Sequence, residues 1–253
     1  YFPKNEGAGL PTFRSVLTQL ATAWEDDREN VLKSANSVTE ALRDYVRQQA
    51  SGGGAKVNAT TLDKAYTRTQ TQYDKVNGGF GDKPKYPQPV ILNFLLRHYA
   101  RTGERDALNM TVRTLHALVD GGIHDHIGDG FYRYSTDAAW RVPHFEKMLY
   151  DQAQIAVSFL EAFQLTRDSF YADTARSTLE YVLREMKSVE GGFYSAVDAD
   201  SLLKSGAAET GEGVFYLWDT QQIQQALDER TAPVFTFAYG IEPPGILFVR
   251  HSL

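Results

Sequence analysis

Apolar residues recur every three or four positions along most of the chain, which is the period of a helix with one buried face. The first such run extends from Phe13 to Trp24, and a more polar run covers residues 27–49. Pro89 and Pro143 stand where two later runs begin, and proline is favoured in the first turn of a helix. The pattern predicts helices over residues 13–24, 27–49, 62–73, 89–99, 108–119, 143–163 and 171–183, and a capped helix from residue 219.

Glycine-rich segments separate these helices. Thr102-Gly103 is a tight turn that would join two helices into an antiparallel hairpin. Glycine pairs, or a Glu-Gly pair, precede an apolar residue near several helix ends, at residues 78–80, 121–123, 191–193 and 212–215. Capping alone explains one such glycine, but recurring hairpins with glycine turns predict an all-α fold, an α/α toroid of helical hairpins.

Residues 51–54, Ser-Gly-Gly-Gly, form a flexible linker between two parts of the chain. A length of 253 residues allows either one large domain or two small ones. The linker favours two, with a boundary between residues 1–50 and residues 55–253.

Composition and charge exclude several classes of function. No apolar run approaches the ~18 residues of a membrane-spanning helix, and a net charge of −6 without a basic stripe argues against a nucleic-acid partner. The absence of cysteine excludes disulfides, thiolate catalysis and Cys-ligated zinc within this chain. The sequence predicts no cofactor. A cytoplasmic location is expected because no secretion signal opens the chain.

The densest group of reactive side chains lies in residues 122–150. His124, His126 and His144 are three of the six histidines of the chain, and Glu146 follows His144 in the predicted first turn of the helix from residue 143. Because imidazole titrates near neutral pH, His144 and one of the other two could act as general acid and base. Two alternatives stay open. The histidines and Glu146 could hold a divalent metal, although no known ligand spacing is present, or they could only fasten the loop through hydrogen bonds.

Asp198 and Asp200 form a second candidate group. A glycosidase needs two carboxyl groups ~5 to ~9.5 Å apart, and Glu146, Asp129 or Asp137 could supply the second. Aspartates also commonly form turns and helix caps, and this alternative stays open too.

Further side chains of the same segments could bind a ligand. Aromatic rings could form a platform for a sugar or belong to the core, and arginines could orient an anionic group. Lys147 and Asp151 are four positions apart on the predicted helix, within reach of an ion pair. The predicted ligand-binding residues are Tyr132, Arg133, Tyr134, Trp140, Arg141 and Asp151.

Residues 78–87, 128–135, 140–151, 191–201 and 212–218 resemble segments of the spermatogenesis-associated protein 20 family. The most specific is Trp140-Arg-Val-Pro-His-Phe-Glu-Lys-Met-Leu-Tyr-Asp151, and the resemblance covers nearly the whole chain. It implies a thioredoxin-like domain joined to a toroid similar to six-hairpin glycosidases and N-acylglucosamine 2-epimerases. By this resemblance, residues 1–50 are the end of the thioredoxin-like domain and a linker helix, without its C-x-x-C pair. Residues 55–253 are about half of a toroid.

The resemblance also implies a carbohydrate-active domain. In similar epimerases a pair of histidines moves a proton at the carbon beside a carbonyl, a part that the three histidines above could play. In similar glycosidases two carboxylates do the work, a part for Glu146 with Asp198 or Asp200. We expect acid/base chemistry on a small sugar-like ligand, with isomerisation ahead of hydrolysis. The alternative is a non-catalytic binding or scaffold module that serves the thioredoxin-like domain.

Overall fold

The computed structural model describes residues 2, 11–51, 58–202 and 209–241. The chain divides into two compact units, Tyr1–Asn58 and Ala59–Leu253. The glycines of the predicted linker lie outside the described residues. The assignment of the first unit to a thioredoxin-like domain stays a prediction.

The described residues of the first unit form two helices, α1 (Phe13–Asp26) and α2 (Arg28–Ser51). Both lie where the apolar period predicted them. The apolar side chains of α1 occupy one face, and Phe13, Leu17, Leu20 and Trp24 on that face are all exposed.

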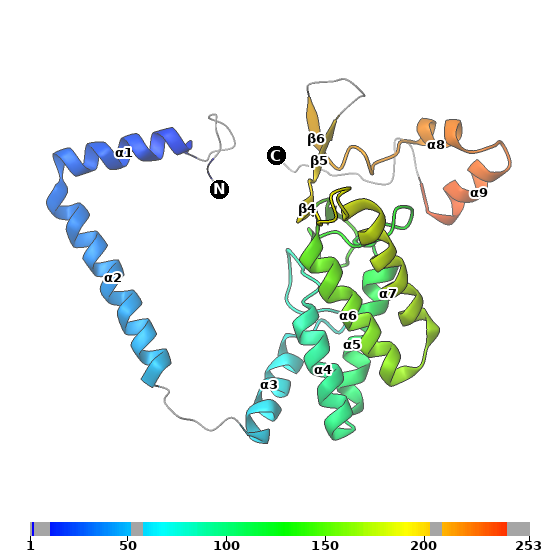
Figure 1. Ribbon diagram of the computed structural model, residues 1–253, viewed down its shortest axis with the longest axis horizontal. Helices are drawn as coiled ribbons and strands as arrows, with labels where there is room; N and C mark the ends of the chain where they lie inside the picture. The colour runs from blue at the N-terminus through cyan, green and yellow to red at the C-terminus, as the bar shows by residue number, and fades with distance from the viewer. Residues whose placement is uncertain (1, 3–10, 52–57, 203–208, 242–253) are drawn as a thin grey trace. The chain divides into compact units, whose positions relative to one another are not determined.

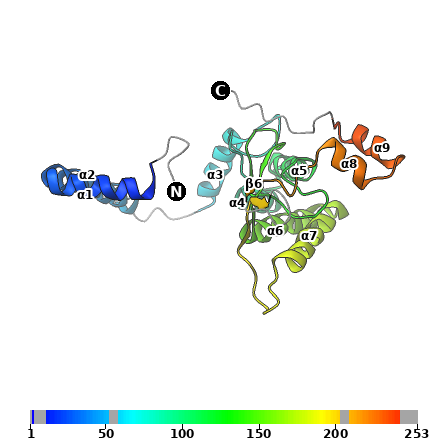
Figure 2. The same ribbon diagram turned by 90° about the horizontal axis from the view of Figure 1, so that it is seen from above.

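The second unit is built from helical hairpins (Figure 1). Its helices are α3 (Ala59–Gln72), α4 (Pro89–Thr102), α5 (Arg105–Asp120), α6 (Leu149–Thr166), α7 (Ser169–Tyr181), α8 (Thr220–Ala226) and α9 (Thr231–Ala238), and a π-helical turn, Val182–Met186, extends α7. Gly103 and Arg167, both with positive φ, close the α4–α5 and α6–α7 hairpins. α4 packs against α3, α5 and α6, and α6 packs against α7 (Figures 1 and 2). The predicted all-α fold, a partial α/α toroid of helical hairpins, is confirmed.

The main hydrophobic core holds α3 to α7 together, and a smaller cluster of Tyr181, Val182 and Met186 lies at the end of α7. Leu92, Leu95 and Leu96 of α4 are fully buried against Leu115 of α5 and Phe159 of α6. Full burial of one such side chain contributes about 1.5–3 kcal/mol. No helix among the described residues combines the length and the apolar character needed to span a membrane.

Short antiparallel ribbons stand among the loops at one end of the helices (Figure 1). β1 (Tyr134–Ser135) pairs with β2 (Pro143–His144), β3 (Lys147–Met148) with β4 (Ala196–Val197), and β5 (Asp200–Leu202) with β6 (Thr210–Glu212). The prediction that a helix begins at Pro143 is therefore wrong. Residues 143–148 are extended because their backbone pairs with other loop segments, and α6 begins only at Leu149.

The loops that follow α3 and α5 share one backbone structure. The N–H of Asp74 donates to the carbonyl of Gly79 at 2.9 Å, and that of Asp125 donates to Gly130 at 3.0 Å. Each carboxylate also accepts the N–H groups two and three positions further on. A third loop has a related pattern that is one residue shorter, in which the N–H of Ser188 donates to Gly192, four positions further on instead of five. The repeat expected from the glycine pairs is present, but its second copy is centred on Gly130 rather than on residues 121–123.

A buried lysine clamps each of the first two loops. Lys85, with a side chain that is 0% exposed, donates to Asp74 at 2.6 Å and to the carbonyl of Ala138 at 2.9 Å. Lys147, 1% exposed, donates to Asp125 at 2.7 Å and to the carbonyl of Asp129 at 2.8 Å. Burial lowers the pKa of Lys147, and the Asp125 carboxylate opposes that shift.

The predicted ion pair between Lys147 and Asp151 is wrong. Lys147 lies in β3, before the helix begins, so it does not share a helix face with Asp151. Its ammonium group instead points into the loop of Asp125.

Candidate functional site

His144 is the centre of the candidate site, and its closest partner is Glu212. The β1–β2 register sets His144 opposite Tyr134, and the β5–β6 hairpin ends at Glu212. The imidazole Nδ1 lies 2.6 Å from Glu212 Oε1, and the two side chains are 25% and 48% exposed. An ionised carboxylate only accepts hydrogen bonds, so in the neutral imidazole this contact places the proton on Nδ1 and the lone pair on Nε2.

Close packing of the next residues brings Glu212 to His144. Gly213 has a φ of +70° and lies so close to the ring of Phe145 that a Cβ atom would collide with it. Tyr216 stacks on the same ring, with centroids 5.7 Å apart. The segment after β6 is thus held against the residue that follows His144.

Glu146 and Arg133 lie on the other side of the imidazole. Glu146 Oε2 is 3.8 Å from His144 Nε2 and accepts a 2.7 Å hydrogen bond from Arg133 Nη1. The backbone N–H of Arg133 also donates to the carbonyl of Glu146 at 2.8 Å. Arg133 therefore fixes Glu146 and balances its charge beside the free imidazole nitrogen.

Asp151, in the first turn of α6, is a second acid near this group. Its Oδ2 is buried and has no hydrogen-bond partner among the described residues. Burial raises the pKa of Asp151 to about 6, with Arg133 opposing the shift and Glu146 adding to it. A carboxyl group of this kind can hold a proton near neutral pH, as a general acid must.

His124 and His126 form a separate pair. Their rings are 5.0 Å apart in an edge-to-face arrangement, and His126 Nε2 lies 3.0 Å from the carbonyl of Gly121. Both ring nitrogens of His124 are buried and lack a partner among the described residues. Burial, with a smaller effect from His126, lowers the pKa of His124 to about 4. In the described part of the chain, no hydrogen bond, ion pair or ring contact joins either histidine to His144.

Asp198 and Asp200 are both exposed. Asp200 is the first residue of β5, and Asp198 precedes the strand. Asp198 Oδ1 accepts the backbone N–H of Asp200 at 3.0 Å, which is the turn geometry that the sequence had left open. Asp200 faces Glu212 across the β5–β6 ribbon. The pairing of β5 with β6 therefore helps to hold Glu212 in place.

The predicted ligand-binding residues fall into two groups. Arg133, Tyr134 and Asp151 lie around the site. Tyr132 and Trp140 are 4% and 1% exposed and belong to the core, the alternative that their sequence pattern left open. The side chain of Trp140 donates from Nε1 to a loop carbonyl at 3.1 Å. Arg141 is exposed, and its backbone N–H donates to the carboxylate of Asp137.

Glu212 is the main residue that sequence reasoning did not assign to the site. It stands 68 positions from His144, and no periodic pattern links residues at that separation. The only signal was its place in the segment 212–218, which resembles the family. No group of three or more His, Cys, Asp or Glu side chains in the described ranges is arranged to hold a metal ion.

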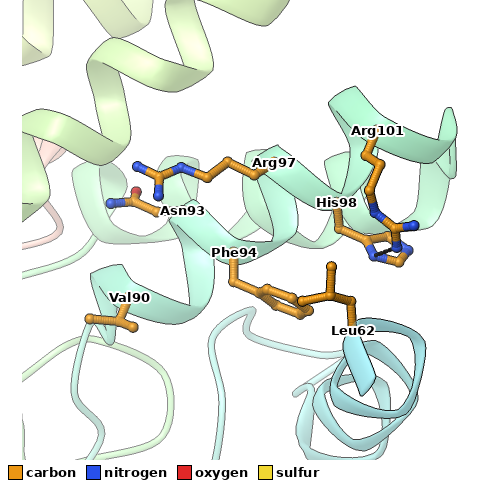
Figure 3. Close-up of a pocket in the computed structure, with 7 residues that line it drawn as sticks. All are labelled: Leu62, Val90, Asn93, Phe94, Arg97, His98 and Arg101. Atoms are coloured by element: carbon orange, nitrogen blue, oxygen red, sulfur yellow. Dashed lines mark hydrogen bonds between the residues drawn. The ribbon is translucent and has the colours of Figure 1, made fainter. Parts of the chain in front are cut away.

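A separate surface cavity of about 470 Å³ lies along the side of α4 (Figure 3). It is lined by Leu62 of α3 and by Val90, Asn93, Phe94, Arg97, His98 and Arg101 of α4. Its arginines already have partners, Arg97 with Glu161 at 2.5 Å and Arg101 with Asp63 at 2.9 Å. None of the predicted site residues lines this cavity.

Comparison with known proteins identifies the relatives of this chain. A scan against protein-family models finds no match. Human spermatogenesis-associated protein 20 is 42% identical over 237 residues, which cover 90% of this chain and 30% of the human protein. The chain is a homologue of spermatogenesis-associated protein 20. The family resemblance predicted from the sequence is thereby confirmed, and the chain spans less than a third of the length of this relative.

Solved structures with a similar arrangement of helices include two sugar-processing enzymes. Cellobiose 2-epimerase from Bacillus thermoamylovorans has a TM-score of 0.49 at 14% identity, over 59% of this chain and 46% of the epimerase. A GH76 α-mannanase from Bacteroides thetaiotaomicron has a TM-score of 0.45 at 21% identity, over 52% of this chain and 40% of the mannanase. At these values the likeness is one of fold alone.

Proposed function

We propose that this chain carries out acid/base chemistry on a sugar or sugar-like ligand, with His144 as the proton-transfer group. The observation that supports this most is the 2.6 Å hydrogen bond between His144 Nδ1 and Glu212 Oε1. Such a bond fixes the tautomer of an imidazole and stabilises the imidazolium that forms when the other nitrogen takes a proton.

The proposed step begins at the carbon beside the carbonyl of an open-chain sugar. His144 Nε2 accepts the proton of that carbon, and the C–H electron pair forms a C=C bond. Asp151 supplies a proton to the carbonyl oxygen, so the product of this half-reaction is a neutral enediol. In the second half-reaction the Asp151 carboxylate takes a hydroxyl proton of the enediol and a carbonyl re-forms. Protonation of the neighbouring carbon by the His144 imidazolium gives the isomer, and protonation of the original carbon by water on the other face, with His144 losing its proton to solvent, gives the epimer.

The charges around His144 support proton transfer over glycoside hydrolysis. Glu146 and Glu212 both contact the same imidazole, at 3.8 and 2.6 Å, so they do not form a pair of carboxyl groups across an open gap. Asp198 and Asp200 are exposed on the hairpin that carries Glu212. We therefore favour isomerisation over glycoside hydrolysis as the reaction.

The alternative is a scaffold in which the same contacts only fasten the β5–β6 hairpin to the loop. It is favoured by one observation, namely that His144, Glu146, Glu212 and Arg133 all have a partner within the chain. In that case, loss of Glu212 would lower stability and change no reaction.

Solvent deuterium incorporation tests the proposed function. The chain is incubated in D₂O with a panel of aldoses and ketoses, and ¹H NMR follows the C2–H signal and any new isomer. We expect exchange on at least one sugar, a decrease of about 10²–10⁴-fold with His144→Asn, which removes a general base, and a smaller decrease of at least about tenfold with Glu212→Gln.

Glu229→Gln is the matched control, because Glu229 is an exposed glutamate outside the site. Its exchange rate should equal that of the unmodified chain. The proposal fails if no sugar of the panel exchanges, or if His144→Asn exchanges as fast as the unmodified chain.

A further inference from the structure

Three extended segments lie side by side next to the candidate site. Lys85 and Ser135 form an antiparallel bridge, with backbone hydrogen bonds of 2.8 and 2.9 Å in the two directions. Ser135 in turn faces Pro143 across the β1–β2 ribbon. Lys85, Ser135 and Pro143 are all buried, so they form the inner face of this small sheet.

Successive side chains of a strand point to opposite faces, which places Tyr86, Tyr134 and His144 together on the outer face. The ring centroids of Tyr86 and Tyr134 are 4.9 Å apart, and those of Tyr134 and His144 are also 4.9 Å apart. The three rings form a row that runs across the strands. This ring row ends at the imidazole that is bonded to Glu212.

Tyr86 differs from the central ring of the row. Tyr134 has an aromatic neighbour on both sides, whereas Tyr86 contacts Tyr134 and no other ring among the described residues. Tyr86 is 42% exposed, and its hydroxyl has no hydrogen-bond partner in the described ranges. A tyrosine of this kind offers an apolar ring and a free polar group, the combination that suits the C–H and O–H groups of a sugar.

We propose that Tyr86 forms a distal subsite, so that the ligand is a disaccharide or longer glycoside with its reducing end at His144. This inference rests on the proposed function. Two ring-to-ring contacts separate Tyr86 from His144, so a sugar ring over Tyr86 is a different ring from the one that reacts. Tyr134 lies between the two positions in the row.

Binding measurements with matched sugars test the subsite. Isothermal titration is carried out with glucose, mannose and galactose, and with disaccharides that have each of these sugars at the reducing end. We expect at least one disaccharide to bind at least fivefold more tightly than its own monosaccharide. Tyr86→Ala should remove that advantage and leave the dissociation constant of the monosaccharide unchanged, whereas Tyr86→Phe, which keeps the ring and loses the hydroxyl, should keep part of it.

Tyr194→Ala is the control for loss of an exposed tyrosine, since Tyr194 is 56% exposed and lies outside the ring row. It should preserve the disaccharide advantage. The subsite is refuted if Tyr86→Ala weakens both sugars equally, or if no disaccharide binds better than its monosaccharide. If monosaccharides still exchange deuterium in that second case, the proposed function survives. If no sugar binds or exchanges, both proposals fail.

Discussion

Asp151→Asn is expected to stabilise the protein increasingly as the pH rises above about 4, with the full gain above pH 6. The carboxyl group of Asp151 has a pKa of about 6 in the folded chain, against an ordinary value of 3.8. The folded state therefore holds the proton more tightly than the unfolded state, and stability falls as the pH rises from about 4 through 6. A difference of about 2 units corresponds to about 3 kcal/mol at pH 8. Because water entry relaxes a buried charge, we expect a measured gain of about 1–3 kcal/mol.

Urea unfolding at pH 4 and pH 8 measures this gain. Asparagine has nearly the shape of the acid and stays neutral, so the two chains should have similar stability at pH 4 and differ at pH 8. If Asp151 also donates a proton to a sugar, the same variant gains stability and loses deuterium exchange. Equal stability of the two chains at pH 8, or the same difference at both pH values, would refute the argument from burial.

Three further predictions concern the loops and turns around the site. Gly130→Ala and Gly103→Ala both place alanine at a φ of +76°, but only the Cβ at Gly130 would meet another side chain, Tyr181, at 2.6 Å. In thermal unfolding, Gly103→Ala should lose about 1 kcal/mol of stability, and Gly130→Ala about 1–3 kcal/mol more. Lys147→Met should cost about 3–5 kcal/mol in urea unfolding, since it leaves the Asp125 carboxylate without its counter-charge, and adding Asp125→Asn should recover part of the loss; no recovery would contradict the clamp. His124 has its pKa lowered to about 4 from 6.5, so its folded form resists protonation and stability falls as the pH drops below 6.5. His124→Gln should remove about 3 kcal/mol of this loss between pH 7 and pH 4, and an unchanged pH dependence would show that His124 is not the cause.

The helices could be predicted from sequence because their signal is local. The apolar period located α1, α2 and α4 to within a few residues, and glycine turns marked the hairpins. The two- and three-residue strands could not be predicted, since so short a segment contains no period. That is why Pro143, which suits either a first helical turn or an edge strand, was assigned to the wrong element.

The candidate site was predicted only in part for the same physical reason. His144, Glu146 and Arg133 are close in sequence, and the structure places them in contact. Glu212 reaches His144 only because Gly213 fits against Phe145, a packing contact between distant segments. The buried environment of Trp140 likewise depends on the loop of Gly79, so its role in the core could not be read from its own neighbours in sequence.

The protonation pattern of His144 tests the central claim most directly. Long-range ¹H–¹⁵N correlation spectra of the imidazole rings distinguish a protonated Nδ1 from a protonated Nε2, and a His144→Asn spectrum assigns the signals. The account predicts that His144 carries its proton on Nδ1, loses that preference in Glu212→Gln, and shifts when an exchanging sugar is added while His116 does not. A proton on Nε2, or a His144 signal that no sugar shifts, would contradict it.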